Sequence, residues 1–317
     1  MARFVARGLS PLFDLSVGRC KAQTPLTFCN TRLDRPLLNN TNQKKQTTGY
    51  KEHVMRLAKQ LCVSILLLGA LSALAQQPPS DPTALSYAAK SVAAMTGNTA
   101  VSDATLTGTV NTWMAGSTND TGTVTLKVKG YGESRVDMQL TLSGALSQIR
   151  DASTGVAQGE AITGGTGSQY SYQNCVTDAA WFYALDSAMA VAPNNGIVLS
   201  YVGLETLGGE SVQHIQSYYY QSGLDPNSQA QLQTNSTIDY YLDATTFIPV
   251  AENFNMFSGS GTAIPVQVLF LGYQTVQGVT SPQHIQEYIN GTLQFDATFT
   301  SVLVITGIPL STFTIPQ

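Results

Sequence analysis

The stretch ESRVDMQLTL, at residues 133–142, alternates polar and apolar side chains from Arg135 onward. The apolar row is Val136, Met138, Leu140 and Leu142, and the polar row is Arg135, Asp137, Gln139 and Thr141. A period of two is typical of a β-strand that turns one row of side chains to a core and the other to water. The stretch therefore predicts a sheet with one dry face and one wet face.

The same alternation continues along most of the chain from Val101 onward. It recurs in ATLTGTVNTWM (104–114), GTVTLKVKG (122–130) and ALSQIRD (145–151), and in seven segments between residues 196 and 305. Glycine, asparagine, aspartate and serine separate these segments, as expected for turns. We count about eleven strands, and we interpret the glycine-rich stretch AITGGTGSQYSYQN (161–174) as a loop between them.

Two helices are predicted beside the sheet. In the first, at residues 81–95, Asp81 can cap the first turn, Pro82 fits the first helical position, and Gly97 follows the end. The second, at residues 177–189, has an apolar stripe at a spacing of four residues, formed by Trp181, Leu185 and Met189. The apolar side of each helix needs an apolar surface to pack against. We expect that surface to be the dry face of the sheet.

The segment 55–75 reads MRLAKQLCVSILLLGALSALA, a short basic start followed by an apolar run and small residues. This layout is typical of a secretory signal peptide, with cleavage expected before Gln76. The apolar run is shorter than the ~20 residues that span a bilayer as a helix. We interpret residues 1–54 as an upstream extension of the gene model. A long cytoplasmic tail on an uncleaved signal anchor is the alternative. The mature protein is then a single domain, residues 76–317.

Removal of residues 1–75 changes the charge of the protein. Eleven of the 16 Lys and Arg residues lie there, against three of the 20 Asp and Glu residues. The remaining chain holds five cationic and 17 anionic side chains, a formal net charge of −12. Without a basic surface it is not expected to bind nucleic acid or anionic lipid surfaces. We expect no stable membrane insertion after cleavage. The predicted location is periplasmic or secreted.

The tetrapeptide QHIQ occurs twice, at residues 213–216 and 283–286. In each copy the isoleucine (Ile215, Ile285) has the parity of a core residue, and the histidine (His214, His284) has the opposite parity. The repeat therefore predicts two strands with the same packing, with the histidines facing out. No H-x-E, H-E-x-x-H or Cys/His cluster accompanies them, so we expect no metal and no cofactor. Cys175, the one cysteine after residue 75, is expected to be a buried or idle thiol.

The C-terminal half resembles the outer-membrane lipoprotein carrier superfamily, which includes LolA-type, LppX-type and MucB-type domains. The resemblance covers residues 81–317 and rests on YVGLETLGGESVQHIQ (201–216), STIDYYLDATTFIPVAEN (236–253), YQTVQGVTSPQHIQEYINGTLQFDATFTSV (273–302) and the closing IPLSTFTIP (308–316). The resemblance implies a fold of the α+β class that is mainly β. We therefore expect a curved, incomplete antiparallel barrel of about eleven strands, with two or three helices covering its open side. In the family, the apolar cavity of this barrel takes acyl chains or a partner.

We therefore expect an exported, non-enzymatic carrier that holds an acyl chain, a lipid or another apolar ligand in a half-barrel cavity. The alternative is a periplasmic protein-interaction or sensor module that uses the same curved sheet. A hydrolase is disfavoured because no catalytic constellation is recognisable. The expected cavity lining combines the dry parity of the strands with the stripe of the second helix: Leu106, Val110, Val136, Met138, Leu140, Trp181, Leu185, Phe254 and Met256.

Overall fold

The computed structural model describes residues 77–97, 99–113, 119–130, 132–177, 180–183 and 196–316. Between residues 77 and 316, these belong to one compact unit. The predicted upstream extension (1–54) and signal peptide (55–75) lie outside the described residues. Among the described residues, none of the helices has the length and apolar character that a membrane crossing requires.

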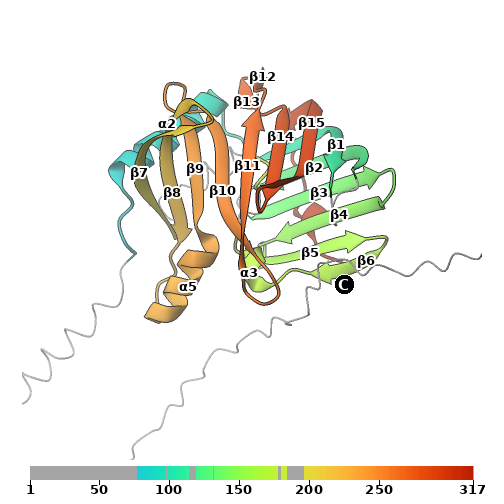
Figure 1. Cartoon of the computed structure of the whole chain (residues 1–317), viewed down its shortest axis with the longest axis horizontal. Helices are drawn as coiled ribbons and strands as arrows, with labels where there is room; N and C mark the ends of the chain where they lie inside the picture. The colour runs from blue at the N-terminus through green and yellow to red at the C-terminus, as the bar shows by residue number, and fades with distance from the viewer. Residues whose placement is uncertain are drawn as a thin grey trace, which may run out of the picture. The chain divides into compact units, whose positions relative to one another are not determined.

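Thirteen antiparallel strands form one sheet in the order β6-β5-β4-β3-β2-β1-β15-β14-β11-β10-β9-β8-β7 (Figure 1). Because β6 and β7 are edges that do not pair with each other, the sheet is an incomplete barrel, as predicted. The strands are β1 (Asp103–Thr112), β2 (Asp120–Lys129), β3 (Glu133–Leu140), β4 (Gly144–Asp151), β5 (Gln158–Thr163), β6 (Thr166–Gln169), β7 (Ile197–Leu207), β8 (Glu210–Tyr219), β9 (Ile238–Asp243), β10 (Pro249–Phe257), β11 (Ala263–Leu271), β14 (His284–Ile289) and β15 (Thr292–Val304). A separate hairpin pairs β12 (Gln274–Val276) with β13 (Val279–Ser281).

The expected count of about eleven strands was low, because part of the predicted loop at 161–174 is a β-hairpin. β5 and β6 pair through Gly164 and Gly165, whose φ angles of 56° and 83° form the turn. Glycine adopts positive φ without steric cost, so the residues that suggested a flexible loop are those that a tight turn requires.

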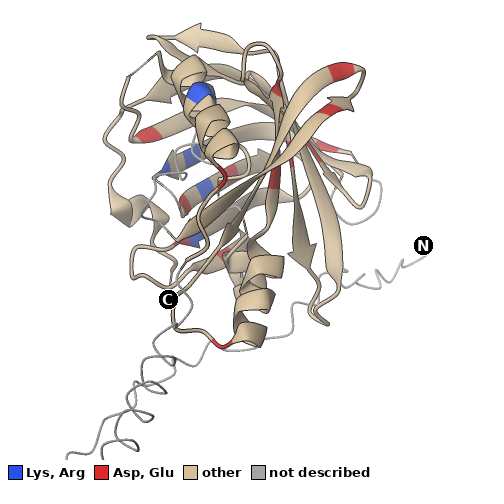
Figure 2. Ribbon diagram, turned by 90° about the vertical axis from the view of Figure 1, so that its left-hand side faces the viewer, with Lys and Arg blue, Asp and Glu red and all other residues tan. Residues whose placement is uncertain are grey.

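One face of the sheet carries a continuous hydrophobic core, to which every strand from β4 to β7 in the sheet order contributes. We call this the inner face and the opposite one the outer face. Figure 2 shows the strands curving around the inner face. Strand parity assigns the sides as predicted: Val136 and Met138 of β3 are buried in the core, whereas Gln139 is exposed. Leu142 is an exception with 68% exposure, because β3 already ends at Leu140.

The first predicted helix is confirmed as α2 (Pro82–Thr96). The Asp81 carboxylate accepts hydrogen bonds from the backbone N–H groups of Thr83 and Ala84, and Pro82 stands at the first position. Gly97 ends the helix in the left-handed conformation, with φ at 55°. The buried stripe of α2 joins the core, and the helix packs against β7, β8 and β13.

The second predicted helix, 177–189, lies mostly outside the described residues. Its described part is not helical, because residues 180–182 form a turn closed by a 2.7 Å hydrogen bond from Tyr183 N to Ala180 O. The one-turn helix α3 (Tyr172–Cys175) precedes this region. A helix that the strand pattern did not reveal, α5 (Pro226–Ser236), begins at an Asp225 cap followed by proline. A 3₁₀ helix, η1 (Leu310–Phe313), lies near the C-terminus and packs against β3 and β4.

Candidate functional site

The structure gathers most of the predicted lining residues on the inner face. These seven belong to the core cluster and are at most 9% exposed: Leu106, Val110, Val136, Met138, Leu140, Trp181 and Phe254. Met256 is partly buried and packs against the same cluster. Leu185 lies outside the described residues. The side chains predicted to line a cavity are therefore in contact with the core of the protein.

A segment of mainly irregular chain, residues 170–183 with 178–179 not described, crosses the inner face. Asn174 pairs with the end of β10, where its amide Nδ2 donates to Phe257 O at 2.8 Å and its Oδ1 accepts from Phe257 N at 2.7 Å. Further along, the Trp181 ring meets the Phe295 ring of β15 edge-on, with centroids 5.3 Å apart. We call residues 170–183 the covering segment. It connects strands that are far apart in the sheet order.

At the start of the covering segment, Tyr170 packs onto Arg150 of β4. The Arg150 guanidinium lies 4.4 Å from the centre of the Tyr170 ring, a cation–π contact. The ring fits because the neighbouring residue of β5 is Gly159, where an added Cβ would lie only 2.5 Å from Tyr170 Cδ2. Burial raises the pKa of the Tyr170 phenol to about 12, the positive charge of Arg150 lowers it, and the carboxyl of Glu287 raises it. Arg150 thus lies against Tyr170, whose pKa the Glu287 carboxyl also influences.

Strand register places Arg150 and Glu287 on the inner face. Arg150 shares the parity of Leu146 on β4, and its partner across the strand pair is Ser134, on the Val136 side of β3. Glu287 of β14 stands opposite Val268 and Phe295, both buried in the core. Burial raises the pKa of the Glu287 carboxyl to about 7. The sequence offered a signal for both residues, since each falls in the dry row of its strand.

A third charged residue on the inner face is Glu252 of β10, which is fully buried. Its register partners, Tyr240 and Val268, are both core residues. Burial, and to a lesser extent the nearby Glu252 carboxyl, raises the pKa of the Tyr273 phenol well above its usual value. The Tyr273 hydroxyl donates to Pro249 O at 2.6 Å. The inner face is therefore apolar along most of β15, β1, β2 and β3, and its charged side chains include Asp120 at the start of β2, Arg150 on β4, Glu252 on β10 and Glu287 on β14.

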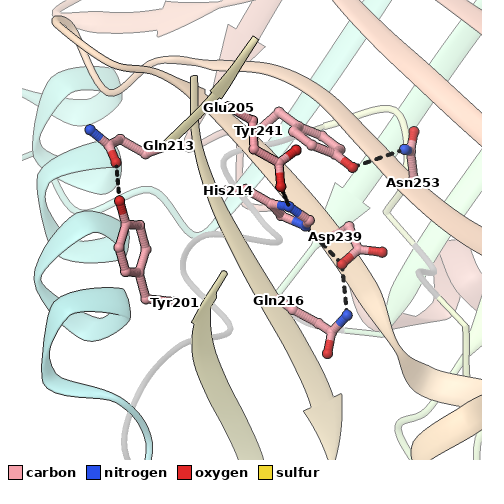
Figure 3. A network of polar contacts seen from close by, with 8 residues as sticks. All are labelled: Tyr201, Glu205, Gln213, His214, Gln216, Asp239, Tyr241 and Asn253. Carbon is pink, nitrogen blue, oxygen red and sulfur yellow. Dashed lines mark hydrogen bonds and ion pairs between the residues drawn. The ribbon is translucent and has the colours of Figure 1, made fainter. Parts of the chain in front are cut away.

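The two QHIQ copies have the predicted parity. Ile215 and Ile285 are 3% and 0% exposed in the core, and the two histidines are on the outer face. The expectation that both histidines reach solvent is wrong for His214, which is only 8% exposed. Figure 3 shows why: β7 and β9 flank β8 with acidic side chains that cover the imidazole, while Gln213 and Tyr201 lie on the other side of the strand.

The His214 imidazole joins two carboxylates. Its Nδ1 lies 2.9 Å from Glu205 Oε1, its Nε2 lies 2.9 Å from Asp239 Oδ1, and the ring stacks on Tyr241 with centroids 4.5 Å apart (Figure 3). Only the imidazolium can donate from both nitrogens. Burial disfavours this charged form, but the hydrogen bonds and charges of Asp239 and Glu205 outweigh burial and raise the His214 pKa. The copy at His284 has one such partner, Asp296 Oδ1 at 2.7 Å.

A pocket of about 540 Å³ adjoins this network at the ends of β9, β10, β11 and β14. Most of its lining side chains are polar. They are Thr237, Asp239, Asn253, Phe254, Asn255, Pro265, Val266, Gln267, Tyr288 and Gly291. Phe254 is the one residue that this pocket shares with the apolar lining predicted from the sequence.

The described residues contain no group of three or more His, Cys, Asp or Glu side chains placed to hold a metal ion. Cys175 is a buried thiol, as expected, and its Sγ donates to Tyr170 O at 3.9 Å. The inner face can bind an apolar group and so remove it from water. The charged side chains of Arg150, Glu252 and Glu287 can bind polar groups of a ligand.

No family model matches the sequence, and no curated protein matches it. Solved structures do align with the chain. A putative outer-membrane lipoprotein-sorting protein domain from Vibrio parahaemolyticus aligns over 73% of this chain and 96% of its own, at 11% identity and a TM-score of 0.48. A DUF1329-family protein from Desulfovibrio piger aligns over 75% and 98%, at 8% identity and 0.47. A LolA-superfamily protein from Nitrosomonas europaea aligns over 73% and 97%, at 13% identity and 0.42.

Proposed function

We propose that the protein is an exported, non-enzymatic carrier that binds an acyl chain, a lipid or a similar apolar ligand on the inner face. The observation that carries this proposal is the position of the covering segment. The described residues of this segment, 170–177 and 180–183, include one helical turn and pack on the apolar face beside α2, so the part of the face beneath them can be uncovered without unfolding a strand or α2. The sequence resemblance to lipoprotein carriers implies the same role.

Binding on this face would be driven by desolvation, at about 25 cal/mol per Å² of apolar surface or about 0.8 kcal/mol per buried CH₂ group. Seven of the predicted lining residues are already buried, so an acyl chain must displace side chains of the covering segment. Trp181 is the natural reporter because its ring contacts both Phe182 and Phe295. A ligand that separates the Trp181 and Phe295 rings should alter the indole emission.

The test is a fluorescence titration with a long-chain acyl probe. The chain has two tryptophans, so the variant Trp113→Phe is used to leave Trp181 as the only one. We expect saturable binding with micromolar affinity. Met138→Lys should abolish the signal, because an unpaired ammonium on the inner face carries a penalty of several kcal/mol. Gln139→Lys, its neighbour on the outer face, is the matched control and should bind normally. A stable wild-type protein that binds no acyl probe would refute the proposal.

A protein-interaction or sensor module is the second candidate. The observation that favours it is the interruption of the apolar lining by Arg150, Glu252 and Glu287, since charged groups can select a peptide segment by complementarity. Failure of the acyl titration would favour this module, and a peptide that protects the covering segment from hydrogen exchange would then support it.

A further inference from the structure

Arg150 is a cation on the inner face, and the described part of the chain supplies no counter-ion for it. Its Nη1 is buried and has no hydrogen-bond partner. Among the described residues, no carboxylate forms an ion pair with it. The five Lys and Arg residues after residue 75 lie on α2, β2, β3 and β4, as Figure 2 shows in blue. Of these five residues, Arg150 is the one that the strand register places on the inner face.

Arg135, on the adjacent strand, differs from Arg150 because its guanidinium N–H groups have hydrogen-bond acceptors. It faces the outer side, where its Nε donates to Asp137 Oδ2 at 2.8 Å and its Nη1 donates to Thr312 O at 3.1 Å. The Tyr170 ring is the contact that the structure provides for the Arg150 guanidinium. This cation–π contact leaves Nη1 without a hydrogen-bond acceptor. A guanidinium fork matches carboxylate and phosphate oxygens in geometry and charge.

The surroundings of Arg150 also fit a ligand with two different ends. On one side is Tyr170, and on the other the dry row of β4 and β3 continues through Leu146 and Met138 into the core. A ligand with an anionic head at Arg150 could therefore extend its apolar tail along β3, β2 and β1. Glu287 forms no ion pair with Arg150, so it does not occupy the place of the head group.

We propose that Arg150 binds the anionic head group, a carboxylate or a phosphate, of an amphiphilic ligand whose tail lies on the inner face. This inference rests on the proposed carrier function and narrows its ligand class from apolar molecules in general to acyl-chain anions. Tyr170 is the positioning residue that holds the guanidinium, and Gly159 is the residue that lets the Tyr170 ring approach.

The experiment compares three probes with the same twelve-carbon tail, namely dodecanoate, dodecyl phosphate and dodecanol, by Trp181 fluorescence or calorimetry. The wild-type protein should bind at least one anion about tenfold more tightly than dodecanol, as expected for charge-assisted hydrogen bonds. Arg150→Gln should remove this preference while dodecanol binding stays unchanged, which also shows that the variant is folded. Arg135→Gln is the matched control and should keep the preference. Arg150→Lys should keep part of it.

The outcomes separate the two proposals. If dodecanol and both anions bind wild type with equal affinity, and Arg150→Gln changes nothing, the head-group site is refuted and the carrier proposal stands. If none of the three probes binds wild type, both proposals fail. A preference for dodecyl phosphate over dodecanoate, or the reverse, supports the site and identifies the source of the anionic group.

Discussion

Asn174 and Phe257 are 83 residues apart in the chain and are joined by two hydrogen bonds, from Nδ2 to the Phe257 carbonyl at 2.8 Å and from the Phe257 N–H to Oδ1 at 2.7 Å. The side-chain amide thus occupies the place of a neighbouring strand at the end of β10. Asn174 is buried, with 2% exposure. This pairing ties the covering segment to the sheet, and it satisfies backbone groups that would otherwise be buried without partners.

Asn174→Ala should loosen the covering segment. The change removes both hydrogen bonds and leaves the Phe257 N–H and carbonyl unpaired, so we expect a loss of about 2–3 kcal/mol in the free energy of unfolding. Backbone amides of residues 170–177 should exchange faster in hydrogen-exchange mass spectrometry, before those of β1 and β2. Asn227→Ala, at an exposed position of α5, is the control. Equal exchange in wild type and Asn174→Ala would contradict the anchoring role.

The isoleucines of the QHIQ repeats should be costly to truncate. Ile215 and Ile285 are 3% and 0% exposed, and each lies on the inner face among core residues. Ile215→Ala and Ile285→Ala should each lower the free energy of unfolding by about 2–4 kcal/mol through the cavity they create. Leu303→Ala, on β15 with 50% exposure, should stay within about 0.5 kcal/mol of wild type. Urea denaturation measures all three.

The side of each strand was predictable from sequence because a period of two leaves only one assignment that buries the apolar row. Val136, Met138 and Leu140 follow that rule. The same rule applies to Arg150 and Glu287, whose parity is that of the core. What the sequence does not contain is the curvature of the sheet between β4 and β14, because this depends on the pairing of the four strands between them and on the covering segment.

Within the predicted second helix, the described residues 180–183 form a turn in which three consecutive bulky residues, Trp181, Phe182 and Tyr183, are all buried. A helix with one buried stripe cannot bury three successive side chains. Tertiary contacts with the sheet override the helix propensity of this stretch. The burial of His214 was also not predictable. Its cover comes from Glu205 and Asp239 of the flanking strands, and a strand's own alternation does not reveal the side chains of its neighbours.

His214 should make stability depend on pH. Its pKa is raised above the usual 6.5 in the folded protein, so the stabilisation it provides is complete below about pH 6.5 and is lost as the pH rises through the folded value. His214→Gln should cost about 1–2 kcal/mol at pH 5.5, less at pH 9, and should flatten this part of the profile. The control is His284→Gln, at a side chain with 33% exposure and one carboxylate partner. A pH-independent difference between wild type and His214→Gln would argue against the double carboxylate contact.

Glu287 should also make stability depend on pH, because its buried negative charge destabilises the folded protein. Its folded pKa of about 7 lies above the usual value of 4.5 for a glutamate, so the folded state is favoured while the carboxyl is protonated. Stability falls as the pH rises from about 4.5 through 7, by up to about 3 kcal/mol. Glu287→Gln keeps the size of the side chain and removes the charge. It should therefore match wild type at pH 4 and be more stable at pH 8. Glu210→Gln, at an exposed position of β8, should show no such gain. If Glu287→Gln is instead less stable than wild type at pH 8, the carboxylate has a cationic partner in the folded protein. Arg150 is the candidate because it is the cation on the inner face, and the head-group site would then already be occupied.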